Sequence, residues 1–178
     1  MIKANIIGLD ALQRKLSNAP KQIQEEVSAE LQISAWEFRD GAKRDLVAAK
    51  GGDRGTLLKS ITAQPLGPLT WEISANQFYA PFIEFGTKAK FNPYPGTEEF
   101  AAQYKGVKGT GALKLIDAIK GWVKRKGIAT GKEIDRVAFL IARSIYKTGI
   151  SPKPFFFKQI TSVRENLYKR LNNILNGI

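Results

Sequence analysis

The chain has 178 residues, 43% of them hydrophobic, which is enough for one domain with a sizeable core. It contains no cysteine and no histidine, so disulfides, thiolate metal sites and every histidine-containing triad are excluded. The formal net charge of +12 favours an anionic partner: nucleic acid, an acidic protein surface or an anionic membrane. No apolar run is long enough to span a membrane, and the start of the chain shows no signal-peptide pattern.

The first part of the chain predicts a strand and two helices. Residues 2–8 begin with alternating apolar and polar side chains, which is typical of a short strand, and a short helix is predicted over residues 9–20. A long amphipathic helix is predicted over residues 21–49, because apolar residues recur there in steps of three and four. These apolar residues are Ile23, Val27, Leu31, Ala35, Phe38, Ala42, Leu46 and Ala49.

An antiparallel pair of strands is predicted next, over residues 57–64 and 69–76. In the second strand Leu69, Trp71 and Ile73 alternate with polar residues, and Pro65, Gly67 and Pro68 mark the turn before it. Residues 2–8 are a candidate third strand. A sheet with one apolar face needs a cover, and the long helix supplies an apolar stripe of the right kind.

The rest of the chain predicts a long surface loop and three more helices. Residues 88–111 contain glycine, proline and charge without periodicity, and a loop of this length is usually functional or disordered. Helical patterns over 112–126 and 133–147 form a helical insertion, and a last helix begins near Ile160. We therefore predict a single α+β domain over residues 1–178, with a small antiparallel sheet packed against a long amphipathic helix and additional C-terminal helices.

Two kinds of catalytic site can be weighed from spacing. Gly127, Gly131 and Lys132 resemble a phosphate-binding loop, but one intervening residue is missing and Glu133 replaces the Ser or Thr that binds magnesium. Adjacent carboxylates such as Glu98 and Glu99 seldom point into one pocket, so solvated charge is the better interpretation. Neither pattern predicts an active site, and no cofactor or metal is expected.

Glu84 is a single acid inside the aromatic stretch "YAPFIEFGT" at residues 79–87. A buried unpaired carboxylate costs several kcal/mol, on the order of the usual desolvation range, so Glu84 needs a partner if it is buried. It could cap the backbone amides of Gly86 and Thr87, meet an arginine across an interface, or act chemically. A structural role is favoured, because neither a histidine nor a second acid is near it in sequence.

Basic residues cluster in "KGWVKRKG", and this cluster is a candidate DNA-contact surface or, alternatively, a solvated helix face. Its members are Lys120, Lys124, Arg125 and Lys126.

Aromatic residues form two dense clusters, "FYAPFIEF" at residues 78–85 and "KPFFF" at residues 153–157. Three consecutive phenylalanines cannot all face one core from a helix or a strand, so we expect at least one of them to point elsewhere. Exposed aromatics close together mark a partner surface, although complete coverage within the monomer is the alternative. The candidate partner-interface residues are Tyr79, Phe82, Glu84, Phe85, Gly86, Thr87, Phe155, Phe156 and Phe157.

Taken in order, these segments resemble the neck or tail-completion (tail-component) proteins of long-tailed bacteriophages. The resemblance rests on "GLDALQRKL" after a first strand, a long helix, "GTLLKSI", "YAPFIEFGT" and "PKPFFFKQI". Lys153 stands where members of this family often carry arginine, and Phe157 and Lys158 stand where a second proline is common. The segment from Lys88 to Lys132 is longer than in compact members.

The resemblance implies a structural, non-enzymatic virion protein of a tailed phage or prophage that acts in neck and tail completion and head–tail joining. Other neck and tail proteins are the expected partners, and a homo-oligomeric ring in the virion, contact with channel DNA and assembly in the bacterial cytoplasm are further expectations. Glu84 would be a polar anchor at the end of a short aromatic helix. Two alternatives stay open: a basic nucleic-acid-binding protein, and a histidine-free hydrolase that uses Glu84.

Overall fold

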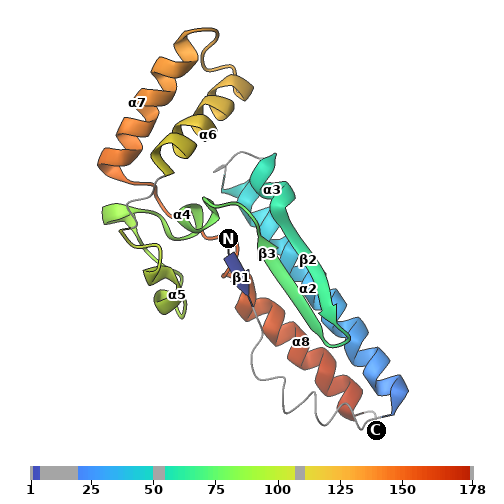
Figure 1. Cartoon of the computed structure of the whole chain (residues 1–178). Coiled ribbons are helices and arrows are strands. Elements are labelled where there is room, and N and C mark those ends of the chain that lie inside the picture. The colour runs from blue at the N-terminus through green and yellow to red at the C-terminus, as the bar shows by residue number, and fades with distance from the viewer. Residues whose placement is uncertain (1, 5–19, 50–54, 107–110, 177–178) are drawn as a thin grey trace. The chain divides into compact units, whose positions relative to one another are not determined.

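The computed structural model describes residues 2–4, 20–49, 55–106 and 111–176, which form two compact units (Figure 1). The first unit contains Met1–Ala80 and Pro154–Ile178, and the second contains Pro81–Lys153. Two compact units can be lobes of one domain or separate domains, so a single domain over residues 1–178 stays a prediction. The combination of a small antiparallel sheet with long helices confirms the predicted α+β class.

The sheet of the first unit has three antiparallel strands in the order β1-β3-β2: β1 (Ile2–Ala4), β2 (Ile61–Gly67) and β3 (Thr70–Ala75). The strand predicted at 69–76 is confirmed as β3, and β1 lies within the strand predicted at 2–8. Residues 5–19, which include most of the predicted helix 9–20, lie outside the described residues.

The strand predicted at residues 57–64 is wrong for its first half. Thr56–Ser60 form a short helix, α3, and only at Ile61 does the chain enter β2. The two adjacent leucines of "TLLKS" do not alternate with polar residues, so period-two patterning begins only at Ile61. The Ser60 hydroxyl donates to the Leu57 carbonyl oxygen at 2.8 Å, a local bond that supports the helical turn.

One face of the sheet is apolar and the other is polar. The register pairs Ile61 with Ala75 and Ala63 with Ile73, so these side chains share the face that packs on the helices. On the opposite face Thr62 lies beside Ser74, with their hydroxyl oxygens 3.3 Å apart, and Gln64 donates to Glu72. This alternation fixes which side of the sheet is covered.

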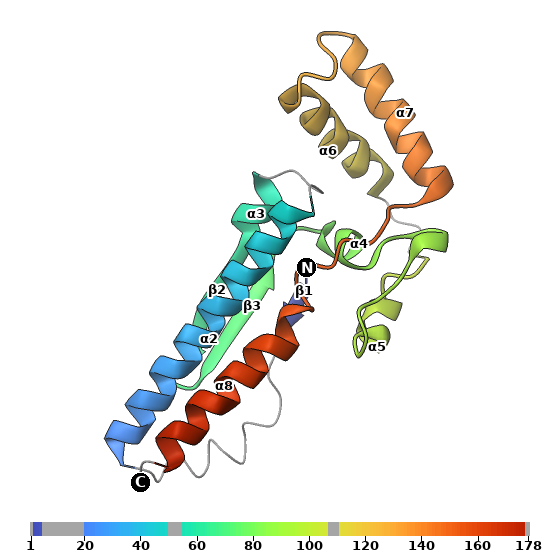
Figure 2. The same ribbon diagram turned by 180° about the vertical axis from the view of Figure 1, so that it is seen from behind.

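Helix α2 (Lys21–Ala48) confirms the predicted long helix and packs on both β2 and β3. With 28 residues it is about 42 Å long. Helix α8 (Gln159–Asn176) lies alongside α2, as both views show (Figure 2). The apolar core between the two helices is formed by Val27, Leu31, Leu167 and Leu171, with Trp71 of the sheet packed against it.

The second unit begins within α4 (Ala80–Phe85) and continues through a 3₁₀ turn, η1 (Lys88–Lys90), and a short helix, α5 (Glu98–Ala102). The sequence predicted an irregular surface loop over 88–111, and η1 and α5 now divide it. Ala101 and Thr97 are buried, so α5 packs against the rest of this unit. Residues 107–110 lie outside the described part.

Helices α6 (Gly111–Arg125) and α7 (Glu133–Thr148) form an antiparallel hairpin and confirm the two predicted helices. The core between them is formed by Ile119 and Val123 of α6, Ala138 and Ala142 of α7, and Ala129 of the connecting loop. Small alanines on α7 let the two helices approach closely, while larger residues such as Trp122 and Ile141 close the edges.

Candidate functional site

The stretch "YAPFIEFGT" forms a tight backbone corner at the end of α4. Gly86 has a φ of +73°, a left-handed conformation that residues with a Cβ rarely adopt. A Cβ at this position would lie 2.7 Å from the Lys90 carbonyl oxygen, 2.8 Å from the Ile150 carbonyl oxygen and 2.9 Å from Cδ of Pro152. Glycine is therefore needed at this corner both for its backbone angle and for the close approach of two other segments.

Hydrogen bonds fasten the returning chain to this corner. The Thr87 amide donates to the Ile150 carbonyl at 3.0 Å, and the Ile150 amide donates to the Thr87 hydroxyl at 2.8 Å. The Lys153 amide donates to the Ile83 carbonyl at 2.8 Å. We name residues 83–87 together with 149–153 the α4 corner; it joins the start and the end of the second unit.

Behind the corner an aromatic cluster fills the interior. Phe85 is fully buried, and its ring centroid lies 6.2 Å from those of Phe100 and Tyr104 and 6.4 Å from that of Phe91. Burial raises the pKa of the Tyr104 phenol above its ordinary value. These contacts explain the aromatic half of the motif: Phe85 packs inside its own unit.

Glu84 is 1% exposed and is engaged in an interaction. Its carboxylate is therefore part of the folded interior and has no solvent-facing surface. Tyr79, Phe82 and Thr87 are only partly buried. Of the nine candidate interface residues, Tyr79, Phe82 and Thr87 are thus partly exposed and the other six are buried, while their contact with a partner stays a prediction.

The expectation that one phenylalanine of the triplet points outward is wrong. Phe155 and Phe156 are fully buried and Phe157 is 6% exposed. The Phe156 ring meets Phe38 of α2 edge-on, with the centroids 5.0 Å apart. The triplet lies before α8 in a segment that is neither helix nor strand, so the fixed side-chain spacing behind the expectation does not apply.

The basic cluster lies at the C-terminal end of α6 and just beyond it. Lys124, Arg125 and Lys126 are exposed, whereas the Lys120 amine is 2.8 Å from a carboxylate oxygen of Asp135 on α7. The hydrogen bond to Asp135 raises the pKa of Lys120. Lys120 therefore bridges α6 to α7, and the other three candidate DNA-contact residues lie exposed to solvent.

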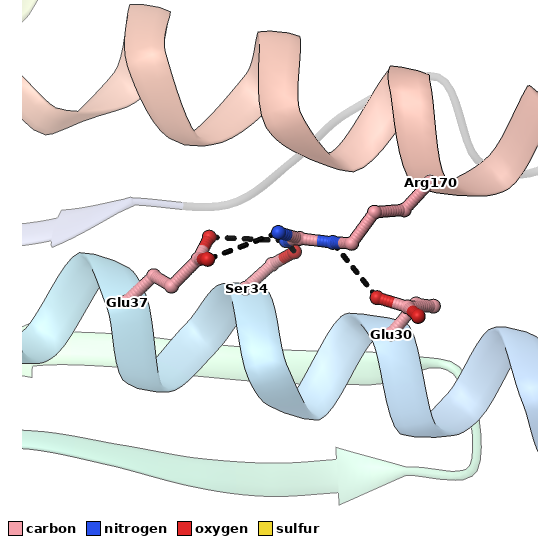
Figure 3. A network of polar contacts seen from close by, with 4 residues as sticks. All are labelled: Glu30, Ser34, Glu37 and Arg170. Atoms are coloured by element: carbon pink, nitrogen blue, oxygen red, sulfur yellow. Dashed lines mark hydrogen bonds and ion pairs between the residues drawn. The ribbon is translucent and has the colours of Figure 1, made fainter.

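Sequence analysis missed a polar network between α2 and α8 (Figure 3). Arg170 donates to both carboxylate oxygens of Glu37 at 2.9 and 3.0 Å and to the Ser34 hydroxyl at 2.6 Å. Its Nε lies 2.7 Å from a carboxylate oxygen of Glu30. The hydrogen bonds to Glu37 raise the pKa of Arg170.

The spacing of Glu30, Ser34 and Glu37 puts all three polar side chains on one face of α2. This shared face is the feature of the sequence that indicates a polar contact there. Arg170 lies opposite the apolar stripe of α8, and its long side chain reaches across to α2.

The described residues hold no group of three or more metal-binding side chains. None of the described helices is both long enough and apolar enough to cross a membrane.

Residues 10–86 match the family model described as "Bacteriophage HK97-gp10, putative tail-component". This tail-component match confirms the predicted resemblance over that segment, which holds α2, α3, β2, β3 and α4. No curated protein and no solved structure matches the chain.

The tail-component match ends at Gly86, the turning point of the α4 corner. It covers 77 of the 178 residues. The Pro154–Phe155 pair, the α6–α7 hairpin and α8 lie beyond it. A phage tail component is a structural kind of protein, so the match points to a structural role and not to catalysis.

Proposed function

We propose that this protein is a structural part of the neck or tail of a tailed phage or prophage, where it completes the tail and takes part in head–tail joining. The observation that carries the proposal is the tail-component match over residues 10–86. In this proposal the protein acts through contacts with further copies in a ring and with other neck and tail proteins. It assembles in the bacterial cytoplasm and remains in the virion.

The α4 corner has a defined part in the proposal. Glu84, Phe85 and Gly86 are buried, so they hold the corner in shape, and the phenylalanine triplet holds α8 against α2 in the same way. Tyr79, Phe82 and Thr87 keep exposed surface and are the residues of the predicted set that can touch a partner directly. Phe78, which is 46% exposed and has its ring centroid 5.3 Å from that of Tyr79, is a further exposed aromatic residue.

Disruption of the gene in the phage or prophage that carries it tests the proposal. We expect heads and tails that fail to join, seen by negative-stain microscopy, and full recovery when the wild-type gene is supplied from a plasmid. Normal infectious particles made without the protein, or virions that never contain it by mass spectrometry, would refute the proposal.

Contact with channel DNA is a second candidate role, favoured by where the charge lies. The second unit, residues 81–153, carries fourteen lysines and arginines against six aspartates and glutamates, so it holds +8 of the net charge of +12. Lys124, Arg125 and Lys126 are exposed at the end of α6. Replacing these three with glutamine should weaken DNA binding and reduce its salt dependence, while binding that is absent even at low salt would remove this role.

A further inference from the structure

Helix α7 presents an exposed face that is both apolar and basic. Phe139 is 56% exposed, Leu140 51% and Tyr146 50%, although the opposite side of the same helix is packed on α6. From Arg136 to Thr148 the helix has three basic residues and no acidic one. The α7 face consists of Arg136, Phe139, Leu140, Arg143, Tyr146 and Lys147.

The surroundings add positive charge to this face. The Lys88 amine lies 5.5 Å from the centre of the Tyr146 ring, a cation–π contact within the same unit. Large exposed aromatics flanked by arginine are the side chains that carry most of the binding energy at protein interfaces. The α7 face therefore suits a protein partner that offers apolar surface bordered by acids.

Helix α2 presents a face of that kind on the first unit. Ile33 and Trp36 are 42% and 43% exposed, and they lie one turn apart on the side of α2 that packs on neither the sheet nor α8. Glu26 and Ala29 precede them on this side and Asp40 follows; all three are exposed. The α2 face consists of Glu26, Ala29, Ile33, Trp36 and Asp40.

The charge on this part of α2 is opposite to that of α7. Residues 22–40 contain five acids and one base, Arg39. Glu30 and Glu37 are bound by Arg170, and Asp40 by Arg39. Glu25 and Glu26 are exposed; Glu25 lies 3.7 Å from the Lys21 amine and Glu26 accepts a hydrogen bond from Gln22, both within the first turns of α2. A tryptophan beside acids complements an arginine-rich helix well, because Trp is the best cation–π acceptor and a frequent interface anchor.

We propose that the α7 face of one copy docks on the α2 face of a second copy. The two faces are different, so the contact is head-to-tail, and each copy keeps one of each face for further neighbours. Such a contact builds a ring where the rotation between copies closes and an open filament where it does not. This inference rests on the proposed function, since it identifies the surfaces through which copies in a ring would meet.

Charge reversal followed by mixing tests this contact in the full-length protein. Variant A carries Arg136→Glu and Arg143→Glu on α7, and variant B carries Glu25→Lys and Glu26→Lys on α2. By sedimentation velocity we expect each variant alone to associate at least ~100-fold more weakly than wild type, because like charges then face each other. An equimolar mixture should recover assembly. The acidic α7 face of variant A then meets the basic α2 face of variant B, and the unchanged α7 face of B meets the unchanged α2 face of A.

A matched control distinguishes the effect of charge on the α7 face from the effect of overall net charge. Arg164→Glu with Lys169→Glu changes the net charge as much as variant A does, but at exposed positions of α8, and should leave association unchanged. Circular dichroism of every variant reports folding. Replacing Trp36 with serine should also weaken assembly, without any change in charge.

Three outcomes would overturn the proposal. If wild type assembles and neither reversal weakens it, other faces make the ring and the proposed function stands. If the reversals weaken assembly but the mixture does not recover, α7 and α2 do not meet between copies. If wild type stays monomeric while variant A is lost from phage particles, the α7 face binds a different virion protein and not a second copy.

Discussion

Replacing Gly86 with alanine tests the central feature of the site, the α4 corner. The left-handed backbone at φ +73° costs a residue with a Cβ about 1 kcal/mol. The added Cβ would also lie 2.7–2.9 Å from two carbonyl oxygens and a proline ring atom, so the returning segment must move away. Losing the two Thr87–Ile150 hydrogen bonds costs about 1 kcal/mol each. We expect a total loss of about 3 kcal/mol.

Gly96 provides a matched control in the same unit. It has a φ of +84°, but a Cβ built there meets nothing within 4 Å, so Gly96→Ala should cost only the backbone part, about 1 kcal/mol. The difference between the two variants, about 2 kcal/mol, isolates the close approach at the corner.

Urea denaturation measures both variants. Trp122 is the one tryptophan of the second unit. In a protein with Trp36 and Trp71 replaced by phenylalanine, tryptophan fluorescence therefore measures the unfolding of that unit. For an m value of about 1.5 kcal/mol/M, the midpoint should fall by ~2 M for Gly86→Ala and by ~0.7 M for Gly96→Ala. Hydrogen exchange at the Thr87 and Ile150 amides should accelerate in the first variant only. Equal losses in the two variants would refute the close-approach argument.

Three further predictions concern the packing and charge of single residues. Arg170→Met should lower the stability of the first unit by about 2 kcal/mol, because Glu30 and Glu37 lose their shared cation. Adding Glu30→Gln and Glu37→Gln to this variant should recover much of that loss. If the urea midpoint of the triple variant stays at the Arg170→Met value, this explanation is contradicted. Leu31→Ala should lower the free energy of unfolding by about 3 kcal/mol, because Leu31 is buried between α2 and α8. A measured loss below about 1 kcal/mol would contradict this, since it would mean that the neighbouring side chains fill the cavity. The raised pKa of Tyr104 means that the folded state keeps its phenolic proton longer than the unfolded chain, so stability is full below about pH 10 and falls as pH rises above it. Tyr104→Phe should reduce that alkaline loss in urea melts between about pH 9 and 11, and an unchanged pH profile would contradict the assignment.

Periodicity predicted the helices well, because each has a continuous apolar stripe. Helix α2 follows its stripe from Ile23 to Leu46, and α6 and α7 follow theirs. The boundaries failed where the pattern was short: "TLLKS" has too few residues to separate a helical turn from a strand, and α5 is a five-residue helix within a loop-like composition.

The site was harder to predict than the fold, because it depends on contacts between distant residues. Gly86 turns the chain, and its approach to Ile150 joins residues 64 positions apart and leaves no local pattern in the sequence. The triplet Phe155–Phe157 was misjudged because its backbone is irregular, so spacing rules did not apply. Arg170 illustrates the same point, since nothing in α8 alone indicates that its side chain reaches α2.

The α4 corner also holds together the two ends of the segment that carries the charged hairpin. The chain leaves at Thr87 and returns at Ile150, and these two residues are hydrogen-bonded, so the ends of the intervening segment are held at one point. A segment with adjacent fixed ends can vary in length at small entropic cost, because loop closure depends only weakly on length. The tail-component match stops at Gly86, one residue before this junction, whereas the second unit beyond carries two-thirds of the net charge. Gly86 and Thr87 therefore mark the boundary between the matched segment, which contributes α2, β2 and β3, and the segment that carries the charged hairpin. In the proposed assembly it is this hairpin that would contact a neighbouring copy.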